Sequence, residues 1–128
     1  MSGTGRITAA VRLAAITFDC ADPAVTGRFY AALLDLPVLW TSERTVALGH
    51  EGEPFLAFTR IDDYRPPTWP DDEVPKQAHL ELGVDDLDAA QAEIVALGAR
   101  VAPLQAAPDR VRVLLDPAGH PFCINLAF

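Results

Sequence analysis

The chain has 128 residues, half of them apolar, and 18 acidic against 10 basic side chains give it a net charge of −8. This length and composition suit one compact domain with a hydrophobic core. The negative charge argues against nucleic acid and anionic membranes as partners, because both would be repelled. Since the sequence has neither a membrane-spanning apolar run nor a signal-peptide core, we expect a cytoplasmic protein, and its arginine-rich and alanine-rich composition suggests a bacterial source.

The first half of the chain has the pattern of one strand, one helix and three further strands. Residues 13–20 alternate in polarity as a half-buried strand does. The pair Asp22-Pro23 follows, with an N-cap residue before a proline at the first helical position. Turn residues then separate three short strand patterns, at 37–42, 44–49 and 54–61.

The second half repeats this order. A strand is predicted at 78–84, Asp86 caps a helix that Gly98 ends, and three strands are predicted at 99–104, 110–115 and 121–128. An internal repeat of this kind predicts two similar units packed side by side. We therefore expect a single domain over residues 1–128 with an α+β fold, in which two βαβββ modules, at 12–61 and 77–128, flank a linker at 62–76 and form a cleft.

Aligning the two halves pairs residues of possible functional importance. The first strands align without a gap and set Ala15 on His79, while the last strands set Leu56 on Cys123. The cysteines, Cys20 and Cys123, lack CxxC spacing, so we expect free thiols.

This arrangement resembles the vicinal oxygen chelate superfamily, which includes glyoxalases, bleomycin-resistance proteins and extradiol dioxygenases. The resemblance covers residues 12–127, and residues 64–70 look like those of a bacterial glyoxalase-like branch. It implies the paired βαβββ fold and a ligand cleft, and a homodimer is common for relatives of this length. The motifs that carry it are Asp22-Pro23, Phe29-Tyr30, His79-Leu80-Glu81-Leu82, Asp85-Asp86-Leu87-Asp88 and Asp116-Pro117-Ala118-Gly119.

The superfamily's enzymes typically hold a divalent metal on four side chains, and the resemblance places these positions at Ala15, Leu56, His79 and Cys123. Alanine and leucine cannot bind a metal, and Mg²⁺ or Mn²⁺ would need several oxygen ligands. We therefore expect no metal cofactor. A zinc ion on His79 and Cys123 would need a third ligand, for which Glu81 and Asp19 are candidates.

The expected cleft is apolar and aromatic with a few polar groups, as small-molecule sites are. Strand alternation predicts that the Glu81 side chain faces the cleft. If Leu56 also faces the cleft, Phe58 does too, and Phe55 faces the core. Trp69 either caps the pocket or packs on its own module, and Arg60 either receives an anionic group or pairs with an acid. The expected ligand residues are Thr17, Asp19, Trp40, Leu56, Phe58, Arg60, Trp69, His79, Glu81 and Cys123.

Three functional hypotheses follow. The leading one is metal-independent binding of an apolar or aromatic small molecule. The second is an enzyme, either a lyase or isomerase with His79 as its catalytic base, or a dioxygenase-like metal enzyme with a rebuilt site that uses His79 and Cys123. The third is an interaction module whose cleft is closed. His79 is otherwise a hydrogen-bonded strand residue, and Cys123 is either a buried thiol or the partner of His79 in a nucleophile pair.

Overall fold

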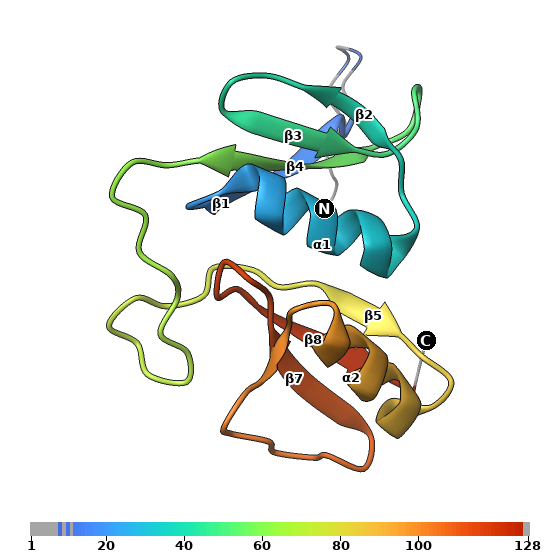
Figure 1. The fold of residues 1–128 in the computed structure, drawn as a ribbon, viewed down its shortest axis with the longest axis vertical. Helices are drawn as coiled ribbons and strands as arrows, with labels where there is room; N and C mark the ends of the chain where they lie inside the picture. Colours follow the sequence, from blue (N-terminus) through green and yellow to red (C-terminus); the bar gives the residue numbers. More distant parts are fainter. Residues whose placement is uncertain (1–7, 9, 11, 127–128) are drawn as a thin grey trace.

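A computed structural model describes residues 8, 10 and 12–126. Figure 1 shows two modules with the same order of elements. The first contains β1 (Ala15–Cys20), α1 (Pro23–Leu34), β2 (Val38–Thr41), β3 (Thr45–Leu48) and β4 (Phe55–Arg60). The second contains β5 (Glu81–Gly83), α2 (Leu87–Ala96), β6 (Arg100–Val101), β7 (Val111–Leu115) and β8 (Pro121–Asn125). The predicted α+β fold of two βαβββ modules is confirmed.

Each module forms its own four-stranded sheet, in the order β1-β4-β3-β2 and β5-β8-β7-β6. The first and last strands of each module are parallel neighbours, and the remaining pairs are antiparallel. This equal topology places β1 and β5 at the edges of their sheets.

The predicted caps begin both helices, and the predicted glycine ends the second. The Asp22 carboxylate accepts hydrogen bonds from the Ala24 and Val25 amides, and Asp86 accepts one from Ala89. Gly98 follows the end of α2 with a φ of 123°, a left-handed conformation that favours glycine. Local signals therefore set the helix boundaries.

One hydrophobic core joins the modules. Figure 1 shows α1 between the first sheet and the second module. The rings of Phe29 and Tyr30 on α1 lie 6.1 and 6.4 Å from the ring of Phe122 on β8. The helix-covered faces of both sheets thus share a core, and their opposite faces, which we call the open faces, are turned away from it.

A buried polar pair also links the modules. The Tyr30 hydroxyl donates a 2.6 Å hydrogen bond to Asp116, a carboxylate that is 1% exposed. Its other oxygen accepts from the amides of Ala118 and His120. Burial and the adjacent Asp116 charge raise the pKa of Tyr30 well above its usual range, so the phenol remains a donor.

Two strands are shorter than predicted. The pattern at 78–84 gives only β5 at Glu81–Gly83, and that at 99–104 gives only β6 at Arg100–Val101, which ends before Pro103. The predicted last strand ends at Asn125, and residues 127 and 128 lie outside the described residues. Among the residues described, no helix combines the length and apolarity that a membrane span requires.

Candidate functional site

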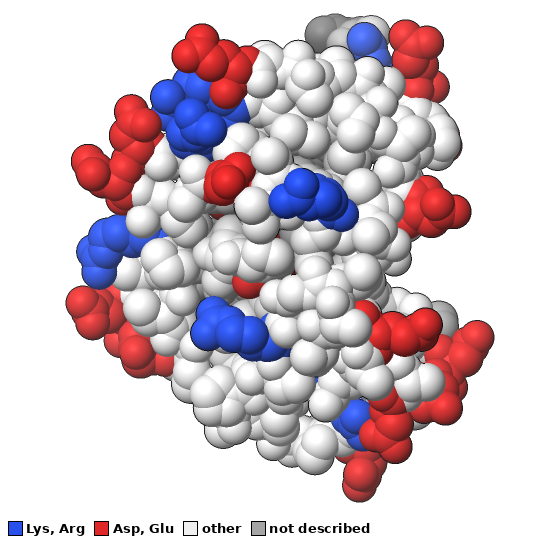
Figure 2. Space-filling model, in the orientation of Figure 1, with Lys and Arg blue, Asp and Glu red and all other residues white. Residues whose placement is uncertain are grey.

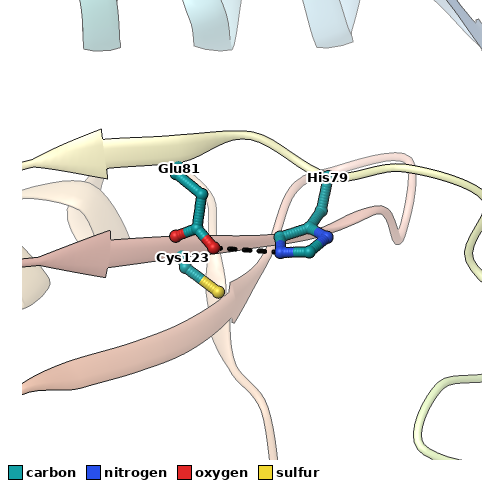
Figure 3. Close-up of side chains that lie close together, drawn as sticks. All are labelled: His79, Glu81 and Cys123. Carbon is teal, nitrogen blue, oxygen red and sulfur yellow. Dashed lines mark hydrogen bonds and ion pairs between the residues drawn. The ribbon is translucent and has the colours of Figure 1, made fainter. Parts of the chain in front are cut away.

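Three side chains with different chemistry meet on the open face of the second module. Glu81 is the register partner of Cys123 across the parallel β5 and β8 pair, and His79 precedes β5 by two residues on the Glu81 side. Their ligand atoms all lie within 4.8 Å of one another. Figure 3 shows His79 and Glu81 joined by a hydrogen bond, with the Cys123 sulfur beside them. The His79 Nε2 donates to the Glu81 Oε1 over 3.1 Å. We call these three residues the triad.

The triad is partly open to solvent. The His79 and Glu81 side chains are 31% and 42% exposed, and Cys123 is half-buried. Burial raises the pKa of the Cys123 thiol, the negative charge of Glu81 raises it further, and Lys76 acts in the opposite direction. At neutral pH the sulfur therefore carries its proton, which does not favour a cysteine–histidine nucleophile pair.

The first module has no such chemistry at the equivalent positions. There Thr17 pairs with Ala57 in the way that Glu81 pairs with Cys123, and Ala15 precedes Thr17 by two residues. The predicted alignment of Leu56 with Cys123 is therefore wrong by one residue. The two modules therefore have the same strand pairing but different side chains at these positions.

That one-residue error reverses the predicted faces of β4. Phe58 is fully buried and stacks on the Tyr30 ring at 5.0 Å, so it lies on the helix-covered side. Leu56 and Arg60 lie on the same side of β4 as Phe58, so they too are outside the predicted cleft. Arg60 is exposed at the end of the strand. Because side chains alternate along a strand, Phe55 lies on the open face, 6.1 Å from Trp40 between ring centroids, and not in the core.

The open face of the first module carries an aromatic pocket of about 520 Å³. Trp40 and Phe55 form its aromatic part, beside Leu13 and Leu39, and the polar residues Arg12, His50, Glu51 and Glu53 also line it. Its lining shares no residue with the triad among the residues described.

Trp69 lies elsewhere, half-buried in the linker, with the Lys76 ammonium 5.9 Å from its ring centroid. Of the two interpretations of Trp69, this contact favours packing near its own segment.

A second pocket, of about 420 Å³, borders the edge of β1. Thr17 and Asp19 line it with linker residues and His120. The His120 Nε2 donates a 2.6 Å hydrogen bond to the Asp19 carbonyl and lies 3.2 Å from the Tyr64 hydroxyl. Nothing in the sequence around His120 indicates a partner 101 positions away.

The four-ligand metal site that the resemblance implies does not fit these residues. Ala15 has no ligand atom, and the register places Ala57 where Leu56 was expected. Of the four positions that the resemblance implies, only the two in the second module offer metal-binding atoms, and Glu81 adds a donor beside them.

Residues 15–125 match the family described as the glyoxalase-like domain. No curated protein matches the sequence. A glyoxalase/bleomycin resistance protein/dioxygenase family enzyme from Burkholderia phytofirmans is similar in structure, with a TM-score of 0.66, 17% identity and coverage of 90% of this chain and 98% of the other. An antibiotic-binding protein from Streptomyces sp. CB03234 has a TM-score of 0.58 and 20% identity, and the match covers 93% of this chain and 98% of the other. The bleomycin-binding protein of Streptomyces verticillus, in complex with copper(II)-bleomycin, has a TM-score of 0.56 and 15% identity, and the match covers 94% of this chain and 100% of the other.

Proposed function

We propose that this chain, which belongs to the glyoxalase-like domain family, binds a small molecule with an apolar or aromatic surface on the open faces of its sheets. The observation that carries the proposal is the aromatic pocket beside Trp40. Trp40 is 45% exposed although its side chain is large and apolar. The pocket's volume of about 520 Å³ falls within the range of about 300–1,000 Å³ that is usual for small-molecule sites.

The side chains of this pocket favour a flat ligand. Trp40 and Phe55 meet edge to face, which leaves ring surface for stacking against a planar group. Arg12, Glu51 and Glu53 supply hydrogen-bonding groups that can orient the ligand. Figure 2 shows Asp and Glu side chains along the edges of both modules, and the net charge of −8 disfavours a strongly anionic ligand.

The similar structures support this class of ligand. One binds an antibiotic and another binds copper(II)-bleomycin. At 15–20% identity the likeness concerns the fold, and folds host many functions. The ligand class for this chain therefore depends on the pocket itself.

We further propose that two copies associate and form the ligand cleft between them. Each copy presents two open faces, one per module, and both carry apolar side chains. Leu13 and Trp40 are exposed at the aromatic pocket of the first module. In the second module, the half-buried Val111 and Val113 on β7 are the register partners of Asn125 and Cys123. A two-fold arrangement that sets the first module of one copy against the second module of the other would cover both faces at once.

Tryptophan fluorescence tests the ligand proposal. Titration with bleomycin and with a set of planar aromatic antibiotics should quench the emission of Trp40. Trp40→Phe should abolish the ligand-dependent quenching, and the matched control Trp69→Phe should retain it. Quenching that disappears with Trp69→Phe alone would place the ligand at the linker and contradict the proposal, as would the lack of quenching by every compound.

The same samples test the two-copy arrangement by light scattering after size exclusion. A dimer mass is expected for the unmodified chain, and Trp40→Glu and Val113→Glu should each shift it toward the monomer, because a charge in an apolar interface is unfavourable. A monomer at all concentrations would contradict the arrangement.

A further inference from the structure

We propose that the triad of His79, Glu81 and Cys123 binds a single zinc ion on the open face of the second module. Its three side chains offer one imidazole nitrogen, one carboxylate oxygen and one sulfur. Zinc accepts all three donor types, and zinc sites with three protein ligands keep a fourth position open. The triad matches that donor count from one module alone.

The backbone places these donors before any metal arrives. Glu81 and Cys123 are register partners on adjacent parallel strands, and the Cys123 amide donates a 2.9 Å hydrogen bond to the Leu80 carbonyl between His79 and Glu81. All three residues are therefore fixed to one hydrogen-bonded strand pair, and binding requires side-chain rotation alone.

The distances are compatible with tetrahedral coordination. Zinc bonds of about 2.0 Å to nitrogen and oxygen and about 2.3 Å to sulfur separate neighbouring ligands by about 3.3 to 3.5 Å. The His79 and Glu81 atoms are 3.1 Å apart, and no pair in the triad exceeds 4.8 Å. Because the His79 and Glu81 side chains are 31% and 42% exposed, small rotations can close the remaining gap.

The chemistry of the donors selects among metals. On binding, the His79 ring would take the tautomer with its proton on Nδ1, so that the Nε2 lone pair coordinates zinc, and the Cys123 thiol would release its proton to solvent. A thiolate ligand favours zinc and other softer ions over Mg²⁺ or Ca²⁺, which require more oxygen donors. Lys76 lies near enough to influence Cys123 electrostatically, and its positive charge opposes the metal.

This site differs from the four-position arrangement that the resemblance implies. All its ligands come from the second module, and Glu81 does not occupy one of those four positions. The open fourth position would hold water, or an oxygen or nitrogen atom of the bound small molecule. This last step alone depends on the proposed function.

Cobalt(II) titration of the metal-free chain, prepared without an affinity tag and dialysed against a chelator, tests the proposal directly. We expect one equivalent to bind with the visible bands of tetrahedral cobalt and a thiolate-to-cobalt charge-transfer band. Zinc should displace it stoichiometrically, and competition with a chromophoric chelator gives the zinc affinity. Binding without a thiolate band would overturn the proposal, as would the lack of binding.

Matched variants locate the site. His79→Ala, Glu81→Gln and Cys123→Ala should each weaken zinc binding by at least about tenfold, since even residues outside the ligand set can change affinity by that factor. His50→Ala and Cys20→Ala, which remove a histidine and a cysteine outside the triad, should leave the affinity and the thiolate band unchanged. Circular dichroism confirms that each variant is folded, and equal affinities across all five folded variants would refute the site.

The outcome is independent of the small-molecule proposal. The metal titration contains no organic ligand, and the fluorescence titration can be run on the metal-free chain. If an antibiotic quenches the tryptophan fluorescence and no zinc binds, the proposed function is retained and the proposed metal site is refuted.

Discussion

The two modules share one backbone plan and differ in what their open faces carry. The pair Thr17 and Ala57 occupies in β1 and β4 the register that Glu81 and Cys123 occupy in β5 and β8. The first module presents an aromatic pocket around Trp40, and the second presents three potential metal ligands. The two modules therefore share the strand pairing that fixes the fold and differ in the side chains of their open faces.

Loss of the polar link between the modules should have the largest effect. Asp116→Ala removes the acceptor of Tyr30 and of two backbone amides, so it leaves buried donors unpaired. We expect the free energy of unfolding to fall by about 3 to 5 kcal/mol, measured by urea denaturation. The control Asp109→Ala, at an exposed position, should change it little.

A fall below about 1 kcal/mol for Asp116→Ala would contradict the view that this pair stabilises the shared core. Two separate transitions in the unmodified chain would show that the modules unfold independently.

The helices differ in how closely they approach their sheets. A Cβ at Gly27 would lie 2.7 Å from Val46 Cγ1 on β3, whereas Gln91 at the equivalent position of α2 bonds to Arg112. Overpacking costs about 1 to 3 kcal/mol, and alanine regains about 1 kcal/mol of helix propensity. Thermal denaturation should thus show Gly27→Ala destabilised by about 1 kcal/mol and Gln91→Ala nearly unchanged. A stabilised Gly27→Ala chain would refute the close approach.

Transfer of the triad to the first module would test whether strand register is sufficient to form a metal site. The combined variant Ala15→His, Thr17→Glu and Ala57→Cys restores the three donor types at the equivalent register positions. We expect cobalt titration to show a second equivalent that binds more weakly than the first, because Ala57 is only 3% exposed and a larger side chain must fit there. A folded variant that still binds one equivalent would mean that register alone does not make the site.

The smallest expected effect concerns the two thiols. Burial raises the pKa of both, and the Glu81 charge further raises that of Cys123. In metal-free protein, iodoacetamide should modify half-buried Cys123 and spare fully buried Cys20 until the chain unfolds. The rate should increase with pH as the thiolate forms.

Glu81→Gln removes the negative charge beside Cys123, so it should lower the pKa of that thiol. The rate profile should then shift to lower pH, with a few-fold faster alkylation at neutral pH. An unchanged profile would show that Glu81 does not influence the sulfur.

The fold was predictable because its signals are local and occur twice. Asp22 and Asp86 cap their helices, and the element order follows from the repeated polarity pattern. The last strands were harder, because the loops before them differ in length and an alignment error of one residue reverses every side chain. That error moved Phe58 to the open face and Phe55 to the core.

The candidate site was predicted in part. The family resemblance indicated that His79 and Cys123 would converge. Strand alternation added Glu81 and Asp19 as possible third ligands, and Glu81 is the one that joins them. The partners of His120 depend on how the linker and the turn after β7 pack against β1. Such long-range contacts leave no periodic signal in the sequence.

Crystallography of the zinc-loaded chain, with anomalous diffraction collected at the zinc absorption edge, tests the asymmetry of the two modules most directly. We expect one strong peak on the second module, about 2.0 to 2.3 Å from the ligand atoms of His79, Glu81 and Cys123, and none beside Ala15 and Ala57. A peak bound by other residues, or no peak in crystals grown with excess zinc, would contradict it.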